Sequence, residues 1–591
     1  MRRLKTRLAA VAAITPLALA ASLPAPFAQA QMFPAAPNPF AAPREAARTA
    51  PLKTLTPVTD ATLAKPADAD WLMWRRTYNG WGYSPLDQID RDNVKGLRMA
   101  WSWALPPGPT EVTPLVHDGV LFVQGFGDGV DALNAANGDL LWRYKRPLPA
   151  GARATVKKSM AIYGDNLLLA TSDRHVVALD AKTGKPAWDV EVPGRGNFGG
   201  AMLVADGKLI LSATNCVTFG CYIVGLDART GRQLWRFNTV AQPGEPGGDT
   251  WNGLPADERY GGSSWTGGSY DPETKLVYWG VGQPYPWNSF ARGTSPQKPG
   301  QSNELLYTNN TLALDPDTGK LAWHFSHLPN DNWDMDYVFE REIIPLKVDG
   351  KERKVVLTAG KIAVLEGLDA KTGEFLYAHD MGLQNIVQSI DPKTGKKTIN
   401  PAVIPEIGKT VLICPHPGGA RSFNATAYNP VTRTLFMPLQ EHCADLTAGP
   451  RAPGERTAPS KFVLRFREGS DGKVGRLDAV DLEAGKSIWS FRERAPQSTA
   501  ALPTGGGLVF EGSMDRWFRA FDDRTGQELW RTRLSDTPNA FPITYSVDGK
   551  QYVAVATGSG SPYTASWGNM FPEIQNPQPS GATLWVFALP D

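Results

Sequence analysis

The sequence predicts an all-β protein, an eight-bladed β-propeller with tryptophan-docking repeats. A short phrase recurs in which a small residue, an apolar residue and Asp or Asn are followed by Gly and then by an aromatic residue. Its copies are spaced by roughly 40 to 50 residues, a period typical of repeat architectures, and four short strands per unit form a propeller blade. The seven clear copies are Ala132–Trp142, Ala178–Trp188, Gly225–Trp235, Ala313–Trp323, Gly367–Tyr377, Ala479–Trp489 and Ala520–Trp530.

Within each copy the residues indicate strands joined by tight turns. The apolar run Val176–Leu179 ends at Asp180, and Gly184 follows before Trp188. Asp starts such a turn by bonding nearby backbone amides, and Gly supplies the positive φ that the turn requires. We expect the repeated Trp to pack one blade against the next as a core residue without a chemical role.

The remaining blades are expected in the two long gaps of the repeat. Residues 269–279 fit an eroded copy in the first gap, and residues 427–436 fit one in the second. We expect a strand at 70–74 to pair with the C-terminal run 583–588 and so close the ring.

The N-terminal residues suggest export. Residues 1–30 are typical of a secretory signal peptide, with a basic start, an apolar stretch and Ala28-Gln29-Ala30 as a cleavage site, so we expect a periplasmic protein. Residues 31–69 indicate an exposed Pro/Ala-rich linker, and 70–591 form the predicted propeller. The apolar stretch is interrupted by Thr15 and Pro16, which argues against a stable membrane span.

Charge and cysteine content narrow the function further. Lys and Arg number 61 against 59 Asp and Glu, a balance that gives no case for nucleic-acid binding. Four Cys in an exported chain suggest two disulfides; three pairings are open, and local order favours Cys216–Cys221 and Cys414–Cys443. The sequence has no C-x-x-C-H motif for covalent haem attachment.

One set of segments is more specific than the repeat. The active site of a propeller lies around the central channel, so its residues come from several blades. The segments are Trp71–Trp74, Tyr83–Leu86, Glu111–Val116, Gly261–Trp265, Gly282–Asn288, Asn332–Asp336 and Gln551–Val555. In this order and spacing they resemble the pyrroloquinoline-quinone (PQQ) dependent alcohol dehydrogenases, the family of the methanol dehydrogenase large subunit, from about Trp71 to the C-terminus.

The resemblance implies a set of cofactor-binding residues. Trp265 would be the flat surface on which the quinone stacks. Because PQQ is a tricarboxylate, it requires buried cations, and Lys158 and Lys361 stand where the family has Arg or Lys. The same resemblance implies that Asp334 is the catalytic base. Further candidates for contacts with the quinone are Glu111, Thr171, Ser263 and, as a third cation, Arg421.

The implied metal site departs from the family pattern. Relatives hold Ca²⁺ with oxygen atoms of a Glu, an Asn and the catalytic Asp. Here Gln283 replaces the Asn, and the Glu position falls in 214–218, which has no carboxylate, so Asn215 is the substitute we consider. Asp336 offers a second carboxylate beside Asp334. An Asp at that offset accompanies lanthanide use in methanol-oxidising branches, which keep the Glu, so Ca²⁺ and a lanthanide ion both stay open.

The substrate side also departs from relatives that oxidise small alcohols. Those enzymes cover the quinone with two adjacent bonded Cys, whereas this chain has Ala152-Arg153-Ala154 there, and residues 495–499 lack the Trp of the family's pocket wall. We therefore expect a wide pocket for a bulky secondary alcohol, a polyol or a sugar. Since no haem is attached, a soluble cytochrome c is the implied electron acceptor. The alternative is an exported propeller scaffold that binds proteins without catalysis, because the fold alone does not fix the function.

Overall fold

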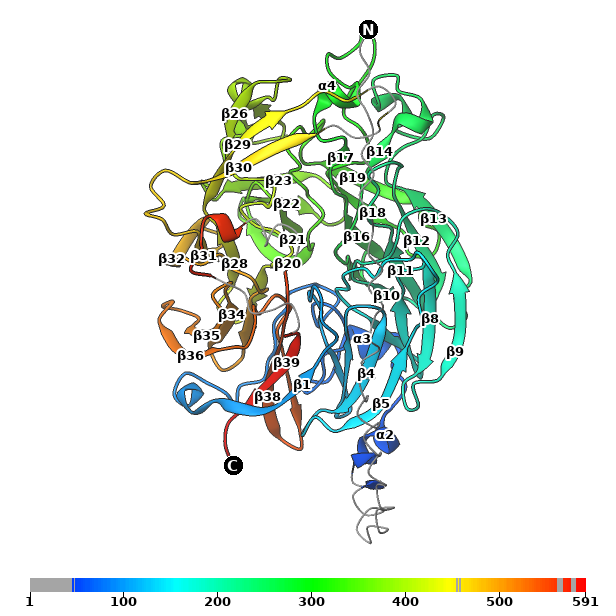
Figure 1. Ribbon diagram of the computed structural model, residues 1–591, viewed down its shortest axis with the longest axis vertical. Helices are drawn as coiled ribbons and strands as arrows, with labels where there is room; N and C mark the ends of the chain where they lie inside the picture. Colours follow the sequence, from blue (N-terminus) through cyan, green and yellow to red (C-terminus); the bar gives the residue numbers. More distant parts are fainter. Residues whose placement is uncertain (1–44, 47, 453–454, 456–458, 561–566, 575–580) are drawn as a thin grey trace, which may run out of the picture. The chain divides into compact units, whose positions relative to one another are not determined.

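Strands dominate the computed structural model, which describes residues 45–46, 48–452, 455, 459–560, 567–574 and 581–591 (Figure 1). The predicted signal peptide therefore lies outside the described residues. Residues from Arg48 to Asp591 form one compact unit. Among the described residues, no helix has the length and apolar character needed to cross a membrane. The short helices are α2 (Ala50–Thr54), α3 (Asp60–Ala64), α4 (Ser289–Arg292) and the 3-10 turns η1 (Val94–Gly96), η2 (Gly248–Thr250), η3 (Ala256–Glu258), η4 (Pro401–Val403) and η5 (Trp567–Asn569).

Four-stranded antiparallel sheets form the body of the all-β propeller, and the described residues contain eight of them. In seven sheets the strands follow one another along the chain, and in the eighth the first strand of the chain joins the last three. The first four sheets are β2 (Leu115–His117), β3 (Val120–Gln124), β4 (Gly129–Asn134) and β5 (Leu140–Lys145); β6 (Ala161–Tyr163), β7 (Asn166–Ala170), β8 (His175–Asp180) and β9 (Pro186–Glu191); β10 (Leu203–Ala205), β11 (Lys208–Ser212), β12 (Tyr222–Asp227) and β13 (Gln233–Asn238); and β15 (Ser269–Asp271), β16 (Leu276–Gly280), β18 (Asn310–Leu314) and β19 (Leu321–Ser326).

The other four large sheets include the one that joins the two ends of the chain, and the strands of three smaller sheets are inserted between or within the large sheets. The small sheets are β14 (Tyr260–Gly261) with β17 (Pro284–Tyr285), β24 (Val387–Ile390) with β25 (Lys397–Ile399), and β26 (Thr410–Ile413) with β29 (His442–Ala448) and β30 (Ser460–Phe466). The large sheets are β20 (Glu342–Val348), β21 (Lys351–Ala359), β22 (Val364–Asp369) and β23 (Phe375–Asp380); β27 (Ala427–Asn429), β28 (Thr434–Gln440), β31 (Gly475–Asp481) and β32 (Lys486–Glu493); β33 (Leu502–Thr504), β34 (Leu508–Gly512), β35 (Trp517–Asp522) and β36 (Glu528–Arg533); and β1 (Arg98–Ala104), β39 (Thr583–Ala588), β38 (Lys550–Thr557) and β37 (Ile543–Val547).

The repeated Trp and Gly explain how neighbouring sheets pack. The Trp142 indole donates to Ala181 O at 2.9 Å, in the turn of the next repeat. Gly184 in that turn has φ +68°, and a Cβ there would lie 2.5 Å from the Trp142 ring. The same fit recurs between Trp235 and Gly319 and in other pairs of successive repeats. The positive φ and the close ring contact both favour Gly, so the Trp is a docking residue, as the sequence predicted.

Two expectations about the repeats are wrong. Residues 269–279 form β15 and β16, which pair with β18 and β19 of the next copy, and residues 427–436 likewise belong to the sheet that ends in β32. These segments are therefore the first strands of sheets with long insertions rather than separate eroded copies. The closing pair is also different, because β39 pairs with β1, whereas Trp71 is fully buried and bridges Val116.

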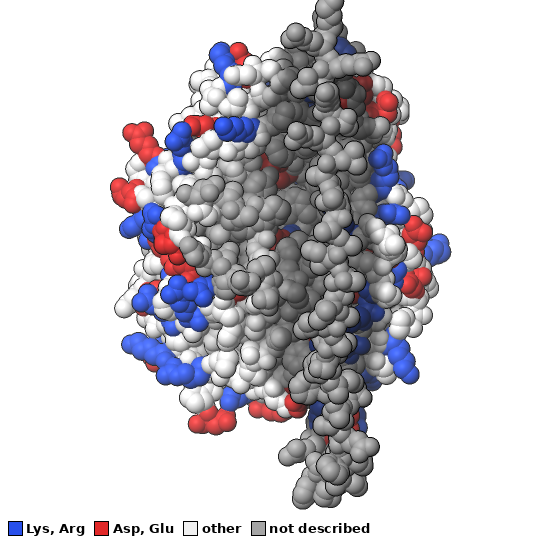
Figure 2. All heavy atoms as spheres, viewed as in Figure 1, with Lys and Arg blue, Asp and Glu red and all other residues white. Residues whose placement is uncertain are grey.

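The structure also bears on the predicted disulfides, the predicted linker and the distribution of surface charge. Cys216–Cys221 and Cys414–Cys443 are both bonded, so the favoured pairing is confirmed. Within the segment expected to be an exposed linker, Leu55, Val58 and Leu63 are buried in the core that also contains β6 and β7. On the face seen in Figure 2, basic and acidic side chains are interspersed wherever grey atoms do not cover the surface.

Candidate active site

The predicted site residues all lie at corresponding ends of their sheets. In an antiparallel sheet the start of the first strand and the end of the second strand share one end. Seven of the residues precede a first strand and four follow a second strand, so the fold can collect them from distant parts of the chain. The first group is Glu111, Lys158, Ser263, Trp265, Asp334, Asp336 and Arg421, and the second is Thr171, Asn215, Gln283 and Lys361.

Within this set, two buried carboxylates share one buried ammonium group. The Nζ atom of Lys361 lies 3.3 Å from Asp334 Oδ2 and 2.7 Å from Asp336 Oδ2, and all three residues are at most 3 % exposed. Lys361 Nζ also donates to the Asp334 carbonyl at 2.9 Å. Burial lowers the pKa of Lys361, but Asp334 and Asp336 outweigh it and hold that pKa above its usual value, so Lys361 is a permanent cation here.

The loop between β19 and β20 carries both carboxylates and is shaped by Asp331, which sequence reasoning missed. Asp331 accepts the amide of Trp333 at 2.8 Å and the amide of Met335 at 2.7 Å. Between them, Asp334 has φ +65°, a conformation that is costly for a non-Gly residue unless its surroundings impose it. Burial raises the pKa of Asp331 to about 6. The available signal was an Asp followed closely by a turn, a typical local cap.

Gln283 bonds this cluster through its backbone amide, and its side-chain oxygen makes no hydrogen bond with the described residues. Its amide donates to Asp336 Oδ1 at 3.0 Å, while its buried Oε1 has no hydrogen-bond partner among the described residues. A buried acceptor without a donor is costly unless a ligand satisfies it. The preceding Gly282 leaves the required space, since a Cβ there would lie 2.4 Å from Asp336 Oδ1. Gly282 also bonds the Ser263 carbonyl at 2.8 Å, which joins Ser263 to the cluster.

A second cluster brings Glu111, Lys158 and Trp265 together. Lys158 Nζ forms an ion pair with Glu111 Oε2 and lies 5.2 Å from the centroid of the Trp265 ring. It lies equally far from the ring of Phe423. Trp265 is half-buried and two residues from Ser263, so the two clusters are neighbours. A buried cation beside a partly open indole face suits a flat, negatively charged ligand.

Three of the predicted residues make other contacts. Arg421 is buried, forms an ion pair with Glu340, and places its guanidinium 4.6 Å from the Phe339 ring, which packs edge-on against Trp265. Arg421 therefore contacts Phe339, and Phe339 in turn contacts Trp265. In the part of the chain that the structure describes, Thr171 bonds within its own turn and Asn215 bonds a residue of another loop. Thr171 Oγ1 accepts the His175 amide at 3.1 Å, and the exposed Asn215 donates to Asn197 Oδ1 at 3.0 Å.

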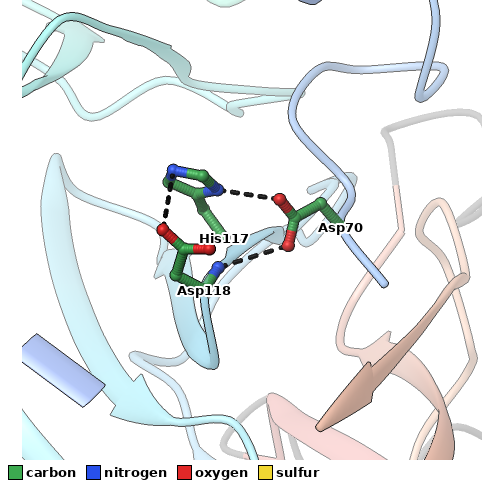
Figure 3. Close-up of side chains that lie close together, drawn as sticks. All are labelled: Asp70, His117 and Asp118. Atoms are coloured by element: carbon green, nitrogen blue, oxygen red, sulfur yellow. Dashed lines mark hydrogen bonds and ion pairs between the residues drawn. The ribbon is translucent and has the colours of Figure 1, made fainter. Parts of the chain in front are cut away.

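A separate group of metal-binding residue types is an internal ion-pair network. His117 Nδ1 lies 2.8 Å from Asp70 Oδ2, and its Nε2 lies 3.3 Å from Asp118 Oδ2 (Figure 3). The same Nε2 lies 2.9 Å from Thr56 O. Asp118 Oδ2 also accepts the Thr56 amide at 2.8 Å. Both ring nitrogens thus face acceptors, which suits a protonated imidazole rather than a metal ligand. The network fastens residue 56 to the β2–β3 turn.

This network should make stability depend on pH. Burial lowers the pKa of His117, but Asp70 and Asp118 outweigh it and raise that pKa above its ordinary value. The stabilisation is then complete below about pH 6.5, the unfolded value, and is lost as the pH rises through the folded value. We expect the difference in Tm between the parent and His117→Gln to be larger at pH 6 than at pH 9. An equal difference at both values would contradict the charged network.

Comparisons with known proteins show which family this chain resembles. Residues 71–381 and 471–553 match the family model of the PQQ glucose/ethanol/alcohol dehydrogenase β-propeller domain. The dehydrogenase subunit of the quinone alcohol dehydrogenase of Acetobacter aceti is 33 % identical over 556 residues, covering 85 % of this chain and 73 % of that protein.

Solved structures extend the similarity to three dimensions. The quinohemoprotein alcohol dehydrogenase ADHIIG of Pseudomonas putida HK5 has a TM-score of 0.81 at 29 % identity, covering 90 % of this chain and 82 % of that one. A europium-containing methanol dehydrogenase also has a TM-score of 0.81, at 26 % identity, covering 90 % and 99 %. These matches show that the chain belongs to the family of PQQ-dependent quinoprotein alcohol dehydrogenases.

Proposed function

We propose that this chain oxidises a bulky secondary alcohol, a polyol or a sugar to a carbonyl compound and passes the electrons to an external cytochrome c. The observation that carries the proposal is the buried set of Asp334, Lys361 and Asp336 with the unpaired Gln283 oxygen. A carboxylate fixed by a permanent cation, next to an acceptor that awaits a ligand, suits proton removal at a metal–quinone site.

The residues present fit the expected cofactors. PQQ, when bound, supplies the hydride acceptor, and Ca²⁺ or a lanthanide ion supplies a Lewis acid. Trp265 would stack on the quinone, and Lys158 and Lys361 would face its negative groups. The further contacts proposed for the quinone are Glu111, Thr171, Ser263 and Arg421, and the proposed metal ligands are Gln283, Asp334, Asp336 and Asn215.

The protein's own part in the reaction follows from the contacts around Asp334. Its carboxylate would accept the hydroxyl proton of the substrate while Lys361 keeps the group in place through Oδ2 and the carbonyl. Asp331 holds the loop, so the carboxylate reaches the site in one orientation. Such preorganisation lowers the entropic cost of bringing base and substrate together.

The proposal of a bulky substrate depends on residues 152–154, where the adjacent Cys pair of small-alcohol enzymes is absent. The missing Trp in 495–499 is weaker support for a wide pocket. That stretch is buried against β34, with the Ser498 amide bonded to Gly512 O at 2.8 Å. A europium-containing relative keeps a lanthanide ion among the metals to be tested.

Three organisational features belong to the same proposal. The eight four-stranded sheets would be the eight blades of a closed ring spanning 70–591, with β1 and β39 joining its two ends. Residues 1–30 would direct export to the periplasm and be removed. Residues 31–69 would lead from the cleavage site to the propeller, with Leu55, Val58 and Leu63 packed into its core.

Reconstitution tests the function directly. Apo-protein should be inactive and should recover dye-linked alcohol oxidation when PQQ is added with Ca²⁺ or La³⁺, across a panel that runs from methanol to large secondary alcohols and sugars. Trp265→Ala should weaken PQQ binding by about 1–3 kcal/mol through lost stacking, by analogy with planar bases. Trp517→Ala is a control, because Trp517 stacks with Arg531 on an edge strand pair outside both clusters. Activity with NAD alone would contradict the proposal, and methanol as the best substrate would contradict the wide pocket.

A further inference from the structure

We propose that His442 is a positioning residue for Lys361, acting through the turn at 416–420. The inference rests on the role proposed for Lys361 and concerns a residue outside both clusters of the site. His442 begins β29 and is fully buried. It does not reach Lys361 itself, so its effect would pass through the backbone that holds the lysine.

Both ring nitrogens of His442 bind that turn. Nε2 donates to the Gly419 carbonyl at 3.0 Å, and Nδ1 accepts the amide of His416 at 3.2 Å. The turn is closed by its own bonds, since the Gly419 amide donates to His416 O at 2.7 Å. A neutral imidazole has one donor and one acceptor, and this geometry uses both in a single orientation. Burial lowers the pKa of His442 to about 4, which agrees with a neutral ring.

The 416–420 turn contacts Lys361 at two points. The Ala420 amide donates to the Lys361 carbonyl at 2.7 Å. Gly419 has φ +91°, and a Cβ there would lie 2.8 Å from Lys361 Cγ, so the glycine lies directly against the lysine side chain. The Lys361 amide also donates to the Asp336 carbonyl at 2.9 Å. Shifting the turn would therefore redirect the ammonium group that Asp334 and Asp336 share.

The position of His442 is fixed from the other side as well. Its neighbour Cys443 is bonded to Cys414, two residues before His416, so the disulfide ties the two histidine segments together. The Trp567 ring packs edge-on against His442 at 4.8 Å. A ring held by a disulfide, an aromatic contact and two hydrogen bonds can transmit a precise position to the turn.

Three substitutions separate positioning from general stability. His442→Gln keeps a donor where Nε2 stands, His442→Asn keeps an acceptor where Nδ1 stands, and His442→Leu keeps neither. Because displacement of about 1 Å can cost about 100-fold in rate, we expect Asn and Leu to lower kcat at least about 10-fold and Gln to restore most of it. The Kd for PQQ, measured by quenching of Trp fluorescence in the apo-protein, should rise in parallel.

His117→Gln is the matched control, because His117 is buried and paired but contacts neither the turn nor Lys361 in the described structure. It should lower Tm without changing kcat or the Kd for PQQ. If His442→Leu keeps the parental kcat and Kd, or if Gln and Asn variants behave alike, the inference is wrong; the second comparison still decides if the Leu variant does not fold. A parent that neither binds nor uses PQQ would instead overturn the proposed function.

Discussion

Asp334→Asn should lower turnover by at least about 100-fold, the lower range for loss of a general base. Asn keeps the shape of the side chain and one oxygen but cannot accept the substrate proton. The reconstituted variant should retain PQQ, because Trp265 and Lys158 are unchanged. Dye-linked kcat at saturating alcohol, together with the absorbance of bound PQQ, measures the two effects separately.

A structural cause can be distinguished from a chemical one in the same experiment. Lys361 keeps Asp336 as a partner at 2.7 Å, so the variant should lose less stability than one in which both carboxylates are neutral. Tm should therefore fall modestly while kcat falls strongly. Turnover close to the parental value would place the base elsewhere, and Asp336 would be the next residue to test.

The repeat could be predicted from the sequence because the docking contact is local and its residues are distinctive. Trp142 must meet a Gly with positive φ one repeat later, and this pair can be seen in the printed sequence. The spacing of the copies alone could not distinguish an eroded repeat from an insertion within a repeat. Residues 269–279 resemble a repeat because they are two strands of a sheet, yet a long excursion carrying β17 and α4 delays the other two strands.

The site was predictable to the extent that its residues stand in recognisable segments. The convergence of Asp334, Gln283 and Lys361 follows from their places at matching strand ends. The partner of each cation did not follow, because pairing is decided by tertiary packing. Lys158 meets Glu111 and Arg421 meets Glu340, a residue without any motif. Asp331 was missed for a different reason: its bonds to the Trp333 and Met335 amides are local, and an Asp that caps a turn looks the same in the sequence whether or not a site lies beside it.

Asp336→Ala should lower metal-dependent activity at least about 10-fold, through displaced catalytic groups. Asp336 uses both oxygens, with Oδ2 at 2.7 Å from Lys361 Nζ and Oδ1 accepting the Gln283 amide at 3.0 Å. Without this carboxylate, Lys361 keeps Asp334 as its carboxylate partner, and the Gln283 amide loses its acceptor. Activity should be measured after chelation and reloading with Ca²⁺ or La³⁺ in separate samples.

The choice of ion then shows whether Asp336 also faces the metal. Coulomb attraction scales with the charge of the ion, so a lost carboxylate ligand weakens La³⁺ binding more than Ca²⁺ binding at similar distance. Asp336→Asn is the matched variant, because its oxygen can still accept the Gln283 amide while the charge is gone. If Asp336 is a ligand, Asn and Ala should both lose more activity with La³⁺ than with Ca²⁺. Equal losses with the two ions would restrict Asp336 to holding Lys361 and Gln283, and activity restored by Asn would assign its role to the Gln283 hydrogen bond alone.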